Sequence, residues 1–295
     1  VGSEMCIRDS TSLEGIVLPY NIKTLASSGS YSSAFYNCSN LKKIALPEGL
    51  TALTENAFYG CSKLEQLHIP STVARIGRSA FYNCKALTHA ALPEGVTEIP
   101  QHAFYGCSAL ASVDIPSTVT TIVGYSFQNC AALKDVTLPD GLTAIGAYAF
   151  SGCKALESIA IPSKVTTIEN HAFYQCANLK TATFSEGLVS LQDDVFYQCV
   201  LLEDVTFPAS LETIGARTFG GCNSFTKISI NIEDIHEYSF WNCTGLTAIE
   251  LGDKVKSIGR NAFISNGGNS VASICLLYTS ASPRDISGSR MPSSA

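Results

Sequence analysis

A cysteine recurs every 23 residues through most of this chain. The column runs through nine positions, namely Cys38, Cys61, Cys84, Cys107, Cys130, Cys153, Cys176, Cys199 and Cys222. A phenylalanine precedes each of these cysteines by three residues, from Phe35 to Phe219. A fixed period of this length is typical of one small unit stacked many times, in contrast to a globular core with a single pocket. Such arrays generally act by presenting an extended surface.

Each unit follows the pattern L-x-x-I-x-L-P-x-x-V-T-x-I-G-x-x-A-F-x-x-C-x-x, of which residues 156–178 are a clean copy. The first part alternates apolar and polar residues, which predicts a strand with one buried face. Proline ends this strand because it has no N–H to donate to a ladder. The V-T-x-I part predicts a second short extended segment. The part that ends in A-F-x-x-C is expected to reverse the chain through helical or 3₁₀ turns.

The apolar columns predict one continuous core, because no single unit can bury its apolar residues alone. The phenylalanine and cysteine columns are assigned to this core, with Phe58, Phe81, Phe104, Phe150, Phe173, Cys61, Cys84, Cys107, Cys153 and Cys176 as representative members. A disulfide requires two Cβ atoms that face each other, whereas equivalent cysteines in adjacent coils point the same way. We therefore expect buried free thiols that pack as small hydrophobic side chains.

This pattern resembles the BspA-type, or treponemal-type, class of leucine-rich repeats, from about Leu13 to Phe263. The resemblance implies a right-handed repeat solenoid. A parallel β-sheet would line its concave side, and short extended segments and helical or 3₁₀ turns would form the convex side. It also implies a surface or secreted protein, since members are mostly such proteins of bacteria and some parasitic protists. Several members are adhesins for host matrix or plasma proteins.

The repeats predict a solenoid over residues 11–274, with about eleven units and truncation at both ends. Residues 1–10 and the segment from Cys275 to Ser280 back-translate to the two orientations of a transposon-end adapter used in sequencing libraries. Residues 1–10 and 275–295 are therefore interpreted as tails of non-native origin. The unit that starts at Phe225 is two residues short, which predicts a local irregularity.

Composition and motifs argue against several functions. The net charge is −6 and no basic stripe occurs, so nucleic acid is not an expected partner. No apolar run is long enough to predict a membrane-spanning segment in the fragment. No C-x-x-C, H-E-x-x-H, P-loop, G-x-G-x-x-G or G-x-S-x-G motif occurs, so we expect no metal site, no cofactor and no catalytic site. His68 and His89 fall on adjacent predicted strands without a clear carboxylate partner, and solvated histidines are the favoured interpretation.

The exposed side of the predicted concave sheet is the candidate ligand-binding surface, because its residues vary between units. The hypothetical ligand-binding residues are Lys43, Gln66, His68, His89, Ser112, Asp114, Asp135, Ser158, Thr181, Asp204 and Lys227. Small residues such as Ala45 and Ala160 would keep this face open to a partner. An ordinary solvated sheet face accounts for the same pattern equally well.

A column of aromatic residues follows the core phenylalanine in most units. Its members are Tyr36, Tyr59, Tyr82, Tyr105, Tyr174, Tyr197 and Trp241, and Gln128, Ser151 and Gly220 interrupt it. These rings either form a ladder for a carbohydrate or apolar partner, or stack on one another along the flank. We favour stacking, so carbohydrate is the less favoured ligand.

The leading hypothesis is a non-enzymatic protein-binding module of a bacterial cell-surface or secreted, adhesin-like protein. Its partner would be a protein such as a host matrix or plasma protein. Two alternatives remain open. The free thiols suit an intracellular scaffold or regulatory repeat domain equally well, and the array could also target an enzyme domain that lies outside this fragment.

Overall fold

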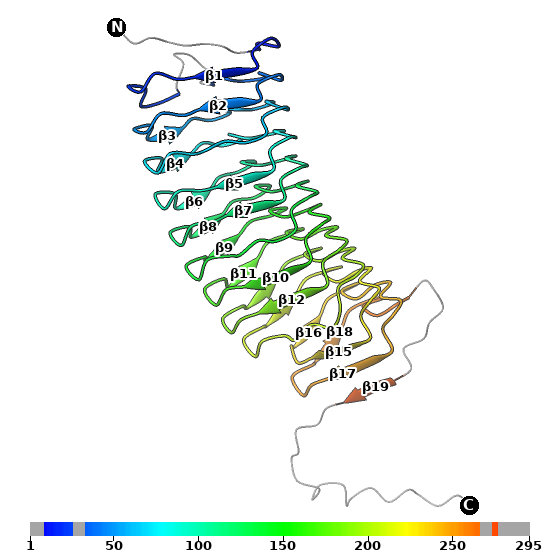
Figure 1. Ribbon diagram of the computed structural model, residues 1–295. Coiled ribbons are helices and arrows are strands. Elements are labelled where there is room, and N and C mark those ends of the chain that lie inside the picture. The colour runs from blue at the N-terminus through cyan, green and yellow to red at the C-terminus, as the bar shows by residue number, and fades with distance from the viewer. Residues whose placement is uncertain (1–8, 26–32, 266–272, 277–295) are drawn as a thin grey trace, which may run out of the picture.

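The computed structural model describes residues 9–25 and 33–265, together with the backbone of residues 273–276. The chain winds into a solenoid whose coils stack from the N-terminal to the C-terminal end (Figure 1). Every strand pairing is parallel, and partners lie one coil apart in the chain, as Ser158 and Thr181 do. The predicted parallel repeat solenoid is therefore the observed fold.

The L-x-x-I-x-L segments form the first sheet. Its strands are β1 (Gly15–Val17), β2 (Lys43–Ala45), β5 (His89–Ala91), β7 (Ser112–Asp114), β10 (Ser158–Ile161), β12 (Thr181–Phe184), β15 (Lys227–Ile230), β17 (Ala248–Leu251) and β19 (Ser273–Leu276). This sheet is discontinuous. Single bridges at Gln66 and Asp135 replace strands, and residues 202–208 form no strand.

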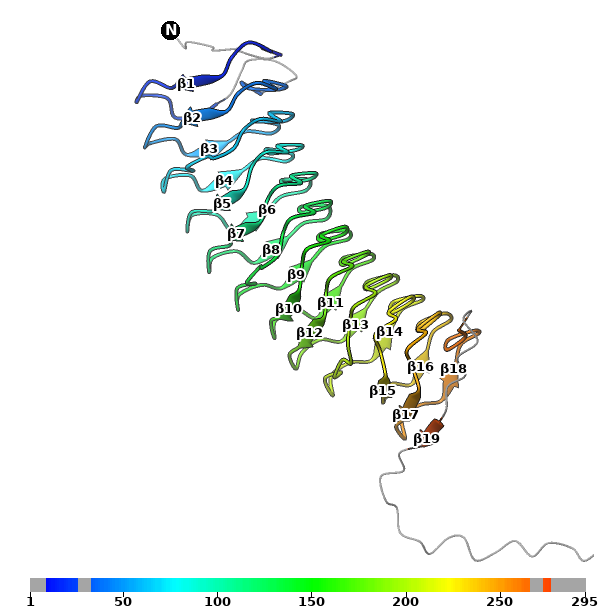
Figure 2. The same ribbon diagram turned by 45° about the vertical axis from the view of Figure 1, so that its right-hand side comes forward.

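The V-T-x-I segments form a second sheet, which lies beside the first in every coil (Figure 2). Its strands are β3 (Ala52–Leu53), β4 (Arg75–Ile76), β6 (Glu98–Ile99), β8 (Thr121–Ile122), β9 (Ala144–Ile145), β11 (Thr167–Ile168), β13 (Ser190–Leu191), β14 (Thr213–Ile214), β16 (Asp234–Ile235) and β18 (Ser257–Ile258). Eight of them, from β6 to β18, make one unbroken sheet. The segments predicted only as short extended pieces thus form the longest continuous sheet among the described residues.

Tight turns connect each strand of the second sheet to the cysteine, and the described residues contain no helix. In the turn from Asn56 to Cys61, every second backbone N–H donates to the carbonyl of the residue three positions earlier. The N–H groups between them donate to the next coil, as Phe58 does to Ala80 over 2.8 Å. Asn56 also adopts a φ of 54°, which a right-handed helix excludes. The prediction of helical or 3₁₀ turns is therefore wrong, because these N–H groups join neighbouring coils.

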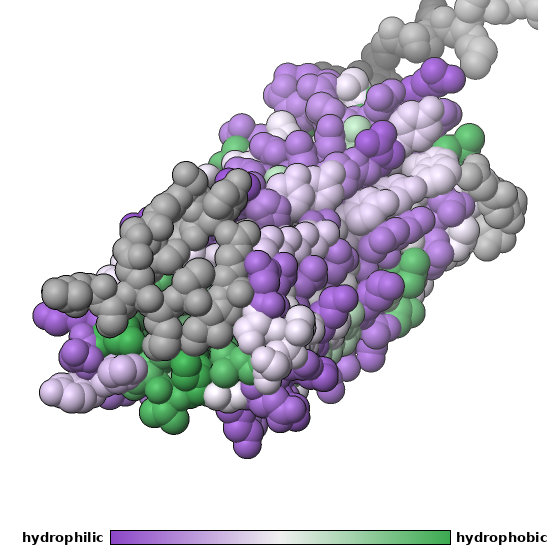
Figure 3. All heavy atoms as spheres, turned by 90° about the horizontal axis from the view of Figure 1, so that it is seen from above, coloured by the Kyte–Doolittle hydropathy of each residue, from purple (hydrophilic) through white to green (hydrophobic). Residues whose placement is uncertain are grey.

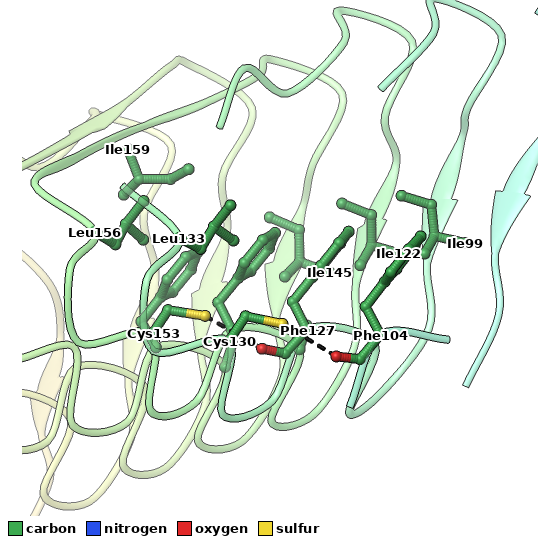
Figure 4. Close-up of a cluster of buried hydrophobic side chains, with 14 of the residues drawn as sticks. Ile99, Phe104, Ile122, Phe127, Cys130, Leu133, Ile145, Cys153, Leu156 and Ile159 are labelled. Atoms are coloured by element: carbon green, nitrogen blue, oxygen red, sulfur yellow. Dashed lines mark hydrogen bonds between the residues drawn. The ribbon is translucent and has the colours of Figure 1, made fainter. Parts of the chain in front are cut away.

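The phenylalanine and cysteine columns lie in the core (Figure 4). Successive core rings, from Phe35 to Phe263, stand 5.0–5.7 Å apart and are parallel within 11°. Each thiol from Cys61 to Cys243 donates to the carbonyl of the phenylalanine in the preceding coil, over 3.0–3.3 Å. One column therefore supplies apolar stacking, and the other satisfies a buried carbonyl in each coil.

The thiols of the ten described cysteines are expected to resist alkylation in the folded protein. All ten are buried, and burial raises the pKa of the Cys243 thiol to about 12. Since the thiolate is the reactive form, iodoacetamide should label none of these ten positions before denaturation and all of them afterwards. Mass-spectrometric mapping of the labelled peptides checks this. Labelling of any column cysteine in the folded chain would show that the core is open there.

Side-chain hydrogen bonds tie coils together in pairs at the turn after the first strand. The Thr72 hydroxyl accepts from the N–H of Gly49 over 3.1 Å and donates to the carbonyl of Leu50 over 2.7 Å. Ser210 makes the same two bonds to Gly187 and Leu188, over 3.0 and 2.8 Å. Turns that contain Glu-Gly are therefore followed by turns that carry a hydroxyl at the matching position, whereas the Asp140-Gly141 turn is followed by Lys164.

Candidate protein-binding face

The predicted ligand-binding residues lie on the outer side of the first sheet, next to the central buried residue of each coil. We call this surface the variable face. Lys43 pairs with Gln66, His89 with Ser112, and Ser158 with Thr181, so the structure brings these residues together as one column. Asp135 pairs with Ser112, and Lys227, which pairs with Ala248, occupies the same position near the C-terminal end. His68 and Asp114 lie beside this column, on the other side of the central buried residue. All eleven predicted residues are exposed except Ser112, which is half-buried.

Both histidines of this face have carboxylate neighbours. His68 Nε2 lies 3.6 Å from Glu48 Oε1, and His89 Nε2 lies 3.4 Å from Asp114 Oδ2. His89 Nδ1 also lies 2.9 Å from Ser112 Oγ. The expectation of histidines without a carboxylate partner is therefore wrong, because the partners stand on neighbouring coils, far away in sequence. No group of three metal-binding side chains occurs among the residues that the structure describes.

Asp204 interrupts the first sheet. Its Oδ1 accepts from the N–H groups of Thr226 and Lys227 over 2.9 and 3.1 Å, and its Oδ2 accepts from the Thr226 hydroxyl over 2.9 Å. In a regular coil such N–H groups bond to a backbone carbonyl, as those of Lys180 and Thr181 do. The carboxylate replaces part of the ladder and leaves residues 202–208 without a strand.

Asp204→Asn is expected to lower the free energy of unfolding by at most about 1 kcal/mol near pH 7, since the group is exposed. Burial raises the pKa of the Asp204 carboxyl, but hydrogen bonds from Lys227 and Thr226 outweigh burial and lower that pKa. A depressed pKa means that the carboxylate stabilises the fold above its unfolded pKa of about 3.9, and that this contribution disappears as the pH falls through the folded pKa. Urea titrations of both proteins from pH 7 to pH 3 check this. A difference that widens at low pH would contradict it.

A hollow of about 450 Å³ opens beside the C-terminal part of the variable face. It lies at the coil that is two residues short, where the sequence predicts an irregularity. Residues from three coils line it, among them Thr206, Phe207, Ser229, Asn231, Asp253 and Lys254. Asn231 Oδ1 accepts from the N–H of Lys254 over 3.0 Å and so bridges the shortened turn to the next coil. The hollow extends the variable face with a concave region.

Most of the variable face is polar. Among the described residues, Val17 in β1 is its one exposed large apolar side chain, with 80% of its surface accessible. Figure 3 shows the molecule from above with respect to the view of Figure 1. Apolar side chains gather near the N-terminal end, while polar ones cover most of the visible surface. At the other end, Lys227 Nζ pairs with Glu250 Oε1 over 2.6 Å. Acidic groups such as Asp114 and Asp135 lie between Lys43 and Lys227 along the face.

Stacked aromatic rings run along one flank. Tyr36, Tyr59, Tyr82 and Tyr105 stand 4.5–4.7 Å apart with planes within 8°. The faces between neighbouring rings contact one another and are closed to a sugar, which agrees with the favoured stacking interpretation.

Sequence reasoning missed a second aromatic column, two residues before the core phenylalanine. His102, Tyr125, Tyr148 and His171 stand 4.4–5.0 Å apart. This column spans the coils in which the first has Gln128 and Ser151, and its rings follow the same 23-residue period. The 23-residue period could therefore have revealed this second column from the sequence.

An ion-pair cluster continues the second column. Asp194, whose side chain is 4% exposed, accepts from Arg217 Nε and Nη2 over 2.8 and 2.7 Å, and its Oδ2 lies 3.5 Å from His171 Nε2. Such a bidentate pair holds both side chains in place. The cluster therefore continues the flank with a rigid polar contact.

Comparisons with known proteins agree with this architecture. The model of the BspA type leucine rich repeat region, in six copies, matches residues 29–157 and 143–270. No protein with a curated function matches the chain. In the part of the chain that the structure describes, no helical segment has the length and hydropathy of a membrane span.

Several solved structures resemble this one. A leucine-rich repeat protein from Bacteroides ovatus has a TM-score of 0.71 and 26% identity, over 92% of this chain and 79% of that chain. A leucine rich cell surface protein from Faecalibacterium prausnitzii has a TM-score of 0.54 and 28% identity, over 94% and 80%. The pneumococcal vaccine antigen PcpA, 19% identical over 83% and 69%, shares the fold with a TM-score of 0.50.

Proposed function

Because the chain belongs to the BspA-type leucine-rich repeat family, we propose that it is a non-enzymatic protein-binding module of a bacterial cell-surface or secreted protein. The variable face is the surface that contacts the partner. One observation carries the proposal: exposed residues of this face change from coil to coil, as Lys43, Gln66 and His89 do, above buried apolar residues such as Ile44. The name of the similar Faecalibacterium protein supports the surface location.

The size and charge of the face suit a protein partner such as a host matrix or plasma protein. Eleven coils, from the coil of β1 to the coil of β17, extend the face to roughly 50 Å at about 4.8 Å each. A standard interface buries about 800 Å² on each partner, which a face of this length approaches. Carboxylates such as Asp114 and Asp135 occupy the middle, so the complementary partner surface is basic at its centre.

Two charge-swapped proteins test the proposal against a panel of immobilised plasma and extracellular-matrix proteins. The face variant combines Lys43→Glu with Asp135→Lys, and Asp135 makes no ion pair among the described residues. The control combines Arg75→Glu with Glu98→Lys on the second sheet. Both pairs leave the net charge unchanged, and all four positions are exposed. Asp204 is left intact because its carboxylate holds the backbone of Thr226 and Lys227.

We expect wild type and the control to bind one or more panel members alike. The face variant should bind at least about tenfold more weakly, which corresponds to about 1.4 kcal/mol. Equal loss in both variants would assign the effect to general electrostatics. Binding that is lost only in the control would move the site to the second sheet, and wild type that binds no panel member would contradict the partner class.

A further inference from the structure

The hollow beside the variable face lies where one turn is shorter than its neighbours. The chain passes from the first sheet to the second in seven steps over residues 251–258, but in five steps over residues 230–235. The longer turns on both sides close on themselves, as the N–H of Val255 does on the carbonyl of Gly252 over 3.3 Å. The short turn therefore leaves a recess between two fixed walls, and this recess of about 450 Å³ is open in the structure as it stands.

The hollow combines apolar walls with a few polar groups. Phe207 and Pro208 are half-buried and Ala209 is exposed, so part of their apolar surface is accessible. Thr206 and Lys254, both exposed, line the same hollow. Binding pockets typically have volumes of roughly 300–1,000 Å³, mostly apolar walls and a small number of polar groups that fix the orientation of the ligand. The hollow therefore suits an apolar side chain with a polar group next to it.

Lys254 indicates which polar group fits. Its ammonium makes no ion pair among the residues that the structure describes. Asp253 beside it already has an interaction partner, and the next lysine along the chain, Lys256, is paired with Glu233 over 2.8 Å. A carboxylate forms the strongest hydrogen bonds with an ammonium group. Lys254 is therefore available to a carboxylate of a ligand.

We propose that this hollow receives an apolar side chain of the protein partner, and that a carboxylate next to that side chain pairs with Lys254. The inference rests on the proposed function, because the hollow continues the variable face at Thr206 and Ser229. A partner surface that is basic opposite Asp114 and Asp135 would then be acidic opposite this end of the face. Side chains that fill such pockets supply a large share of the binding energy of protein interfaces.

Small probes test the hollow without the partner. The full chain, with isotope-labelled isoleucine methyl groups, is titrated with N-acetyl-leucine and observed by nuclear magnetic resonance. N-acetyl-leucinamide lacks the charge of this probe, and N-acetylglycine lacks its apolar side chain. Ile230 lines the hollow, and Ile161 is the reference, because it occupies the same strand position three coils earlier and is equally buried, both at 1%.

We expect N-acetyl-leucine to shift the Ile230 methyl signal saturably and to leave Ile161 unchanged. The amide should bind about threefold more weakly, because it loses one exposed ion pair, and N-acetylglycine about tenfold more weakly. An unsaturable shift, an equal shift at Ile161, or equal binding of either comparison probe would overturn the proposal.

Two variants with matched controls test the walls and the charge. Thr206→Trp fills the hollow, whereas Thr183→Trp adds the same ring at the equivalent exposed position one coil earlier, outside the hollow. Lys254→Gln removes the proposed cation, and Lys256→Gln removes an equal charge that does not line the hollow. Thr206→Trp should bind N-acetyl-leucine at least about tenfold more weakly, and Lys254→Gln should bind the acid and the amide alike. Controls that match wild type are expected, and wild-type binding by either test variant would overturn the proposal.

Competition connects the hollow to the partner. A panel protein that binds the chain should bind more weakly when N-acetyl-leucine saturates the hollow, whereas N-acetylglycine at the same concentration should have no effect. Undiminished binding would overturn the occupation of the hollow by the partner. A panel without any binding protein would contradict the proposed function and with it the protein source of the occupant, whereas an unsaturable Ile230 shift would contradict the hollow alone.

Discussion

Phe150→Ala is expected to lower the free energy of unfolding by about 3–5 kcal/mol. Phe150 is fully buried, and its ring stacks between Phe127 and Phe173 at 5.2 and 5.3 Å. Removing the ring leaves a cavity and deprives two neighbouring rings of a stacking partner. Because each coil contacts only its neighbours, a weakened interface in mid-array separates the two halves of the solenoid.

Urea unfolding followed by far-ultraviolet circular dichroism and by Trp241 emission measures this effect. Val17→Ala is the control, because Val17 is 80% exposed and its truncation should cost less than about 0.5 kcal/mol. In the Phe150 variant the urea transitions reported by circular dichroism and by Trp241 emission are expected to have different midpoints, since Trp241 reports on the C-terminal half alone. A decrease of less than about 1 kcal/mol in the free energy of unfolding, with coincident transitions by both probes, would contradict a core built from stacked rings.

Gly187→Ala is expected to cost about 1–3 kcal/mol more than Gly49→Ala. Both glycines have nearly the same backbone conformation, with φ of +112° and +111°, so both substitutions impose the same strain on an L-residue. A Cβ at Gly187 would also collide with the carbonyl oxygen of Ser163 in the preceding coil, whereas a Cβ at Gly49 meets no atom within 4 Å. The difference therefore isolates the cost of close contact between coils.

Thermal and urea denaturation of the two single variants give this difference directly. Gly49→Ala alone should lose about 1–2 kcal/mol from the positive φ. Equal losses would mean that the coils can move apart at Ser163 without cost, and the tight spacing of the turns would then not stabilise the array.

The 23-residue period was sufficient to predict the parallel stacking. Since buried positions such as Phe104 and Cys107 recur in phase, only one register lets all of them face inward. The period could not give the turn type, because A-F-x-x-C is compatible with a helix when its N–H groups bond locally. In the structure, alternate N–H groups such as that of Phe58 bond across coils.

The candidate face was predictable in position but not in its contacts. The exposed pattern beside Ile44 and Val113 follows from strand alternation. The pairing of His68 with Glu48 joins the segment after the Gln66 bridge to a turn in the preceding coil, which no single unit reveals. The break at Asp204 depends on a side chain that takes over backbone hydrogen bonds, so a pattern of apolar residues does not reveal it.

Carboxyl labelling of the full chain tests most directly whether the variable face contacts a protein. Labelling is compared between the free chain and its complex with the plasma or matrix protein that it binds most tightly. We expect labelling of Asp114 and Asp135 to fall in the complex, while Glu98 and Glu212, which lie in and next to strands of the second sheet, remain unchanged. Protection of Glu98 and Glu212 with full labelling of Asp114 and Asp135 would contradict the assignment and place the partner on the second sheet.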